Sequence, residues 1–527
     1  MSKHDGEKII VNNQPTPDLK RRRLLKASAA AGLTGLAGSA AISPTIALAG
    51  NHEIDLFRIA MWSGMPNLDP EQNAIRTAII AQNWIFDPLV FRDGSTNELK
   101  PYLADEYSFI ANNTWRFKIR EGVKFHNGKD LTAHSVRFSI LRRINEEIGS
   151  PHRKQWGPVV DVNVVDKYTV DIVCNSPFPT ITAYMPILSI FEEGYYSDNS
   201  KEFLALNPMG SGPFRLEEFK PDEVLKVVRN DDYWGQKPII KRVEAPYIGE
   251  SATRVAALLA GDISLTKCDA QDFDRIDSSG VAKMTAIPGN RIVICCFNYE
   301  MEPFNNRKVR QAINHAVNQQ EINEVYIKGS GELLGGPIPS TVFGHNPDLE
   351  PYEYNPALAK QMLAEAGYPN GFKTRIEVVP QWMISGMEIT QALVNYLREI
   401  GIEAEIEVRD AGTLAGRITS RKAGPMYMLS WGGNSTFDSD SYIGALLGKG
   451  AWSTSDIPEV DTLVAQSRAT ADSQERLGLF QEAGEVARED APWVFLHLQP
   501  NAYGVSLNHN WQARADEMMP LWYTKKV

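Results

Sequence analysis

The sequence predicts a mixed α/β protein built from more than one domain. Trp115, Phe117 and Ile119 alternate with charged residues, which is the pattern of a strand with one buried face. Between 309 and 317, apolar residues follow the spacing i, i+3, i+4, i+7 and i+8, so one side of a helix packs inward there. A chain of 527 residues is also too long for a single compact core.

The next elements are predicted in chain order from capping residues, alternation and turns. Thr132 is placed to cap a helix, and the alternation over 162–173 predicts a hairpin. A second pair of strands is expected over 214–228. Ser251 is expected to cap a helix that ends at Gly261.

Helices alternate with strands from residue 292 onward, which predicts an α/β lobe of its own. Asn355 and Pro356 begin one helix in this part, and Gly401 ends the next. The run 402–408 alternates apolar residues with Glu, so a solvent-facing acidic stripe is favoured over a metal site.

The first 49 residues resemble a twin-arginine export signal. Arg21 and Arg22 stand in a basic segment, the run 27–49 has no charged residue, and Ala47 and Ala49 form a small-residue cleavage site. The alternative is a retained membrane anchor, because about 20 apolar residues can span a bilayer. Ala, Gly, Ser and Thr dominate the run, so cleavage after Ala49 is favoured.

Charge and cysteine usage then describe the mature protein. Removing residues 1–49 leaves 478 residues and takes away seven basic and three acidic side chains, which changes the net charge from −11 to −15. An acidic surface argues against nucleic acid and anionic lipid as partners, since both are bound through neutralised phosphates. No cysteine precedes Cys174, so a lipid-anchoring cysteine is missing and a soluble periplasmic protein is expected.

The four cysteines indicate core packing. They are too few for a disulfide scaffold, and their spacing is not that of a zinc site. Cys295 and Cys296 stand in the apolar run 291–297, which predicts a buried strand in which thiols act as small hydrophobic groups. No metal or cofactor is predicted.

The known catalytic patterns are missing from the sequence. There is no G-x-S-x-G elbow and no H-E-x-x-H helix, and the run 329–335 misses G-x-G-x-x-G by one position. His126 and His134 are eight residues apart, beyond one helical turn, so turn or surface roles are favoured over metal binding. An acid–base pair assembled from distant residues, as in a periplasmic hydrolase, stays open as the alternative to a binding protein.

Several segments together resemble one family. Residues 207–216 read Asn-Pro-Met-Gly-Ser-Gly-Pro-Phe-Arg-Leu, and 230–234 read Asn-Asp-Asp-Tyr-Trp. On composition alone, this stretch is a surface hairpin that begins with a glycine turn. Its resemblance is to the signature of the extracellular solute-binding proteins of the peptide/nickel class, family 5, the receptors of oligopeptide-type ABC importers. Further segments of resemblance, in the expected order, are 85–90, 99–104, 115–128, 309–313 and 365–372.

The resemblance implies a type II periplasmic binding protein with two α/β lobes, a two-strand hinge and an extra domain inserted in the first lobe. It implies a monomer that closes on a small-molecule or peptide ligand and docks on an inner-membrane ABC permease with its ATPases, rather than an enzyme. The corresponding ranges are 50–86, 208–291 and 497–527 for lobe I, 87–207 for the inserted domain, and 292–496 for lobe II.

The resemblance also places the ligand between the loop after the first strand and a tryptophan-bearing strand end of lobe II. Glycines there permit close backbone approach and aromatic rings can stack on a solute, although core packing is the alternative for Trp62 and Trp431. The expected ligand-binding residues are Met61, Trp62, Ser63, Gly64, Pro380, Gln381, Trp382, Trp431, Gly432, Gly433, Asn434, Phe437 and Asp438.

Two departures from the peptide receptors bear on the ligand. Those receptors have an Asp three residues after the tryptophan for the peptide amine, and here that position is Asn434. The dipeptide type also has an Arg for the peptide carboxylate, whereas 378–384 contains none. Asp438 is a possible replacement acid. A peptide or amino-acid-derived solute is the first choice, and a modified peptide, an opine-like conjugate and a metal chelate are the alternatives.

Overall fold

The computed structural model describes residues 53–111, 113–432 and 436–526, and all of them belong to one unit, Glu53–Val527. Its main sheet has eleven strands in the order β15-β14-β16-β12-β17-β11-β1-β10-β9-β8, with β13 paired to β17 beside this path. The strands are β1 Phe57–Ala60, β8 Phe214–Lys220, β9 Val224–Arg229, β10 Arg242–Pro246, β11 Leu265–Lys267, β12 Ala282–Phe297, β13 Glu332–Leu333, β14 Lys373–Val378, β15 Glu403–Val408, β16 Met426–Trp431 and β17 Trp493–Ser506.

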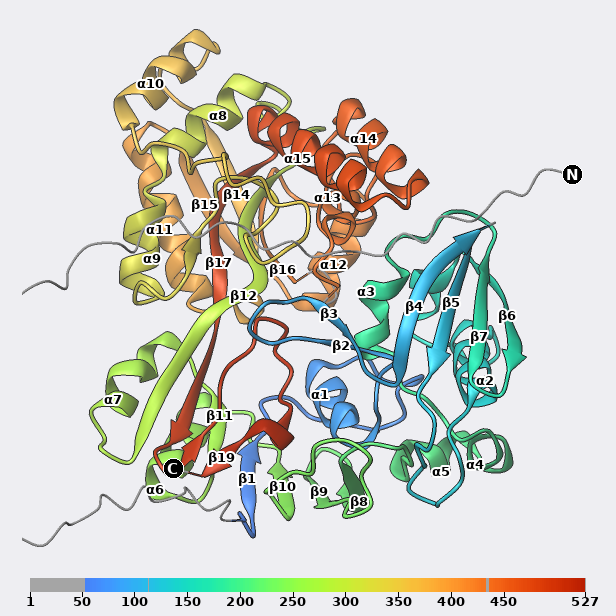
Figure 1. The fold of residues 1–527 in the computed structure, drawn as a ribbon. Coiled ribbons are helices and arrows are strands. Elements are labelled where there is room, and N and C mark those ends of the chain that lie inside the picture. Colours follow the sequence, from blue (N-terminus) through green and yellow to red (C-terminus); the bar gives the residue numbers. More distant parts are fainter. Residues whose placement is uncertain (1–52, 112, 433–435, 527) are drawn as a thin grey trace, which may run out of the picture. The chain divides into compact units, whose positions relative to one another are not determined.

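Two long antiparallel strands, β12 and β17, connect the two halves of this sheet (Figure 1). The first part of β12 pairs with the end of β17, which also holds β11, whereas the last part of β12 holds β16. The register is irregular between Pro288 and Arg291, in the middle of the pair. Gly289 is required there, since a Cβ would lie 2.7 Å from the carbonyl oxygen of Gln499.

In the half of the sheet that contains β14 and β16, helices cover both faces (Figure 1). Val293, Cys295 and Phe297 pack in one hydrophobic cluster, and Ile294 and Cys296 pack in the other. β12 is therefore buried on both faces, as the apolar run predicts. The helices of this half are α8 Arg307–Ala316, α9 Gln319–Tyr326, α10 Pro356–Glu365, α11 Gly386–Glu399, α12 Ala411–Thr419, α13 Ile443–Leu446, α14 Pro458–Ala469 and α15 Ser473–Asp490, with the short turns η4 Pro380–Trp382 and η6 Ser439–Ser441.

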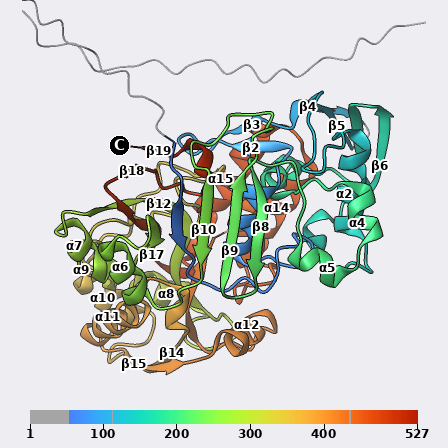
Figure 2. The ribbon, with the colours of Figure 1, turned by 90° about the horizontal axis from the view of Figure 1, so that it is seen from below.

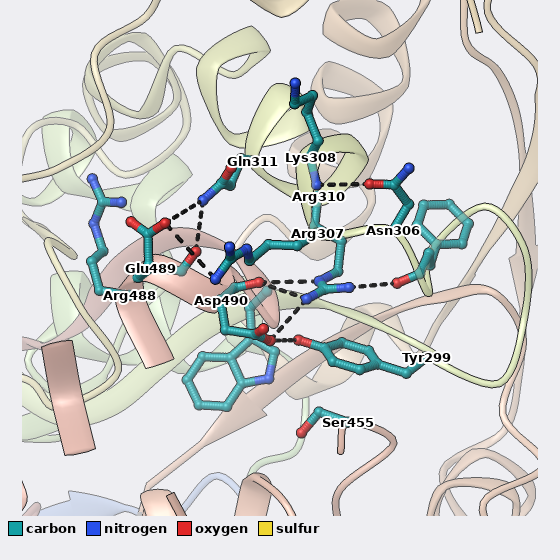
Figure 3. Close-up of polar contacts among 12 residues, drawn as sticks. Tyr299, Asn306, Arg307, Lys308, Arg310, Gln311, Ser455, Arg488, Glu489 and Asp490 are labelled. Carbon is teal, nitrogen blue, oxygen red and sulfur yellow. Dashed lines mark hydrogen bonds and ion pairs between the residues drawn. The ribbon is translucent and has the colours of Figure 1, made fainter. Parts of the chain in front are cut away.

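The end of α15 is fixed against α8 by a buried polar contact (Figure 3). Arg310 is 2% exposed, and its Nη2 donates to the Asp490 carboxylate at 2.8 Å and to the Asp490 carbonyl at 2.8 Å. The hydroxyl of Tyr299 donates to the same carboxylate, and the Arg310 guanidinium lies 3.8 Å from the centre of the Tyr299 ring. These contacts set the point at which the chain enters β17.

The other half of the main sheet has its own core. In Figure 2, β10, β9 and β8 lie side by side. Phe57, Trp84 and Val243 share one hydrophobic cluster with Tyr503 of β17 and Trp522 near the chain end. The remaining elements of this half are α1 Arg76–Ile85, α6 Ser251–Ala260, η3 Ala270–Asp272, α7 Phe273–Asp277, β18 His509–Asn510, η7 Leu521–Tyr523 and β19 Lys525–Lys526.

Residues between α1 and β8 form a separate four-stranded sheet in the order β4-β5-β7-β6, with its own hydrophobic cluster. Phe117 and Ile172 of this sheet pack against Val136 of the covering helix. The elements are β2 Val90–Arg92, β3 Leu99–Pro101, β4 Ala104–Ala111, β5 Thr114–Ile119, α2 Ala133–Ile144, η1 Arg153–Trp156, β6 Val159–Asp166, β7 Thr169–Cys174, α3 Ile181–Tyr184, η2 Met185–Ile187, α4 Glu193–Asp198 and α5 Lys201–Leu206.

Most local predictions are confirmed. Both hairpins and the helices after Thr132, Asn306 and Asn355 are present. The prediction that Ser251 caps a helix is wrong, because Glu250 occupies the N-cap position and the Ser251 hydroxyl instead donates to Asp272 at 3.2 Å. All four cysteines are free and buried, as expected for core packing. No helix among the described residues is long and apolar enough to span a bilayer.

The signature segment contains the expected hairpin, β8–β9, but the residues on either side of it pack in a buried junction. The Asp87 carboxylate accepts hydrogen bonds from Ser211 Oγ at 3.0 Å, Tyr233 Oη at 2.8 Å and Trp234 Nε1 at 2.8 Å. A Cβ at Gly212 would lie 2.6 Å from backbone atoms of α1, so only glycine permits this approach. The two sequence motifs, 85–90 and 207–234, therefore meet around one carboxylate.

Burial raises the pKa of Asp87 to about 7, while its three hydrogen bonds act in the opposite direction. The folded protein thus holds a proton that the unfolded chain releases near pH 4. Stability from this proton is complete below about pH 4 and is lost as the pH rises through about 7. The rise in the pKa of Asp87, about three units, corresponds to about 4 kcal/mol in the free energy of unfolding.

We expect Asp87→Asn to flatten this pH dependence, because an amide does not titrate. The melting temperature of the variant, relative to the unaltered protein, should rise between pH 4 and pH 7 in a thermal unfolding series. Asp232→Asn is the control, since Asp232 is an exposed carboxylate of the same segment. A difference for Asp87→Asn that does not change with pH, or that only matches the control, would contradict the buried proton.

Candidate functional site

A cavity of about 270 Å³ lies at the end of β16. Arg76 reaches it from the first position of α1, Arg291 from β12 just after the irregular register, and Trp382 from η4. Arg76 thus comes from the half of the molecule that contains β1, and Trp382 comes from the half that contains β14. The lining residues are Arg76, Arg291, Trp382, Leu429, Ser430, Trp431, Gly432 and Trp452.

Aromatic rings form one wall of the cavity. The Trp431 Nε1 atom donates to the carbonyl oxygen of Ser441 at 2.7 Å, which fixes the ring. The rings of Trp431 and Trp452 lie 5.3 Å apart at an angle of 52°. With Trp382, they present apolar, planar surface to a solute.

Positive charge gathers beside this wall around one buried carboxylate. Glu517 forms ion pairs with Arg76 at 3.1 Å and with Lys267 at 2.8 Å. Although burial acts to raise the pKa of Glu517, the charges of Lys267, Arg76 and Arg291 lower it to about 2. Glu517 is therefore ionised at neutral pH. Among the described residues, the one hydrogen bond of the Arg291 side chain is a long contact of 3.4 Å from Nη1 to the Ser430 carbonyl.

Three of the predicted site residues, Trp382, Trp431 and Gly432, line the cavity. Pro380 is half-buried at the start of η4, and Gln381 beside it is exposed. Neither lines the cavity.

The loop after β1 lies outside the lining. Met61 is fully buried in the core. Trp62 is half-buried, and the ammonium group of Lys267 lies 5.2 Å from the centre of its ring. Lys267 also pairs with Glu517, so it connects Trp62 to that carboxylate. Ser63 Oγ lies 2.8 Å from the hydroxyl of Thr77, and a Cβ at Gly64 would lie 2.3 Å from the carboxylate of Asp222.

Phe437 and Asp438 are buried behind the cavity. The Asp438 carboxylate has two hydrogen bonds of 3.0 Å from Arg476, so its charge is already compensated. The guanidinium of Arg92 in β2 lies 4.6 Å from the centre of the Phe437 ring and donates to the Thr436 carbonyl at 2.8 Å. The predicted site residues Gly433 and Asn434 lie outside the described residues.

Arg76, Arg291 and Trp452 were not predicted as site residues. Arg291 is the charged residue at the start of the apolar run 291–297, within β12, which is a recognisable signal. Arg76 and Glu517 are more than 400 positions apart in the sequence, and no local pattern indicates their contact. No group of three or more His, Cys, Asp or Glu in the described part of the chain could hold a metal ion.

Residues 98–454 match the family described as "Bacterial extracellular solute-binding proteins, family 5 Middle". The chain belongs to this family. It is 28% identical over 463 residues to the heme-binding protein A of Haemophilus influenzae, covering 80% of this chain and 84% of that protein. It is 25% identical over 458 residues to the glutathione-binding protein GsiB of Pectobacterium atrosepticum, covering 83% and 87%.

A solved structure supports the same fold. The periplasmic binding protein DppA of Helicobacter pylori, in complex with the peptide STSA, is 25% identical with a TM-score of 0.74, covering 90% of this chain and 99% of that one. The expected two-lobe, type II binding-protein fold is therefore confirmed. The relatives are binding proteins of transporters and not enzymes, and proteins of this family are periplasmic or extracellular.

We expect Trp431→Ala to weaken solute binding. Truncating an aromatic anchor typically costs about 2 kcal/mol, which is roughly 30-fold in affinity. Trp115→Ala is the matched control, because Trp115 is a half-buried tryptophan on β5 that does not line the cavity. Titration calorimetry with the solute that co-purifies with the protein measures both variants. Equal losses for the two would contradict a binding role for Trp431.

Proposed function

We propose that this chain captures a peptide or peptide-like solute between its two lobes and delivers it to an inner-membrane ABC permease. The observation that supports this is the cavity, which is lined by Arg76 from one half of the molecule and by Trp431 from the other. A solute in contact with both residues favours the closed arrangement by its difference in affinity for the two arrangements. The irregular register between β12 and β17 is the place where we expect the lobes to move.

The lobes and the export route are part of the same proposal. Lobe I consists of 50–86, 208–291 and 497–527, the inserted domain is 87–207, and lobe II is 292–496. The separate hydrophobic clusters support the division in the main, although Phe191, Tyr196 and Leu204 of the inserted range pack in the cluster of lobe I. The protein is exported by the twin-arginine route, cleaved after Ala49, and acts in the periplasm as a soluble monomer without a lipid anchor.

The first choice of ligand is a peptide derivative. The glutathione-binding name of one relative and the bound peptide in the structure of another support this choice. The heme-binding name of a third relative supports the alternative, a non-peptide solute such as an opine-like conjugate or a metal chelate. The cavity volume lies near the lower end for small-molecule sites, which favours a small solute.

A free α-amine is not expected to be a main determinant. Asn434 replaces the aspartate of the peptide receptors, and the Asp438 carboxylate is already paired with Arg476. A neutral amide gives an ammonium roughly half or less of the 1.5–3 kcal/mol of a charge-assisted hydrogen bond.

Native mass spectrometry of protein purified from the periplasm tests the function. We expect an unchanged small solute to be released, and small-angle scattering to show a smaller radius of gyration when that solute is added back. Ala-Ala serves as the comparison ligand and should bind at least tenfold more weakly. An unchanged radius at saturating solute would contradict lobe closure, and release of a reaction product would favour a hydrolase.

Replacing both Arg21 and Arg22 by Lys should block export, because the twin-arginine pair is the expected recognition element. Fractionation of cells, followed by intact mass of the exported protein, measures both export and the cleavage site. A doubly substituted precursor that reaches the periplasm at the normal rate would exclude this route.

A further inference from the structure

The charges at the cavity do not balance. Lys267, Arg76 and Arg291 all act on one buried carboxylate, Glu517, so this group has an excess of two positive charges. The lining residues described above include no Asp or Glu. The excess is local, since the chain as a whole has a net charge of −11.

Arg291 is the member of this group without a counter-ion. Within the described residues it forms no ion pair, and its long contact with the Ser430 carbonyl leaves most of its donors unused. It is half-buried, and a partly desolvated cation without a partner is unfavourable in the free protein. A negatively charged ligand group would remove this penalty.

Neighbouring residues leave this guanidinium accessible and add further unused polar atoms. A Cβ at Gly432 would lie 3.3 Å from Arg291 Nη2, so a larger residue at this position would crowd that side of the guanidinium. The hydroxyl of Ser430, which lines the cavity, has no hydrogen-bond partner among the described residues. The side-chain nitrogen of Asn290, which is 2% exposed, has none in the same part of the chain.

We propose that the solute has at least two negative charges, and that Arg291 binds one of its carboxylates as the main determinant of specificity. Arg76 supplies the second positive charge from the same lobe as Arg291, and the apolar part of the solute packs on Trp431 and Trp452 of the opposite lobe. The planar guanidinium fork suits a carboxylate, which it can bind through two hydrogen bonds. This inference rests on the proposed function and narrows its ligand class to dicarboxylates.

Three blocked dipeptides of nearly equal size test the proposal. Acetyl-Glu-Ala has two carboxylates, acetyl-Gln-Ala has one, and acetyl-Gln-Ala amide has none, while no member has a free amine. Calorimetry of the mature protein should show a loss of at least tenfold in affinity for each carboxylate removed, which is the size of a lost charge-assisted contact.

Arg291→Gln should reduce one of the two steps of preference, between a pair of probes that differ by one carboxylate, to about threefold or less. A neutral amide keeps hydrogen bonding without the charge. Arg291→Lys should restore part of the preference, since the charge returns without the planar fork. Arg398→Gln is the matched control. Arg398 is exposed on α11 and bonded to Asn395, so its loss should leave all three affinities unchanged.

The outcomes separate this inference from the proposed function. A graded preference that depends on Arg291 supports both. Equal affinities for the three probes, or a preference for the neutral amide, would overturn the dicarboxylate proposal while the protein would still be a receptor. A graded preference that survives in Arg291→Gln would overturn the role of Arg291. Failure of all three probes at millimolar concentration, together with no co-purified solute, would overturn both proposals.

Discussion

The antiparallel pairing of β12 with β17 is the constraint on which the rest of the molecule depends. β16, β14 and β15 are attached through β12, whereas β11, β1 and β10 are attached through β17. The two halves of the main sheet therefore share one two-stranded connection, and the register of this connection is irregular at its centre. Arg291 is the first paired residue after the irregular stretch, so one of the two arginines of the cavity lies where the pairing is irregular.

Local patterns in the sequence predicted the scaffold well, because a period of two or of 3.6 reports directly which face of a strand or helix is buried. The strongest motifs proved to be structural. Asp87 accepts hydrogen bonds from Ser211, Tyr233 and Trp234, and Gly212 packs on the backbone of α1. In this chain the motif residues build a junction and do not line the cavity, so they contain no information about the ligand.

The site was only partly predictable. Trp431 was indicated by its place at the end of an apolar strand, next to small and polar residues, and it does line the cavity. The charged group around Glu517 was not indicated, because Arg76, Lys267 and Glu517 come from three distant parts of the chain. The one clear local error, the cap at Ser251, has a similar cause, since its hydroxyl is used in a tertiary contact with Asp272.

The contacts of Arg92 with Thr436 and Phe437 join the β2–β3 hairpin to the segment that follows the cavity. Arg92 belongs to the β2–β3 hairpin, and its guanidinium holds the Thr436 carbonyl and covers the Phe437 ring. Burial lowers the pKa of Arg92 only to about 10, so it is charged at neutral pH. A change in this hairpin would therefore act on the position of residues 436–437 without any substitution in the cavity.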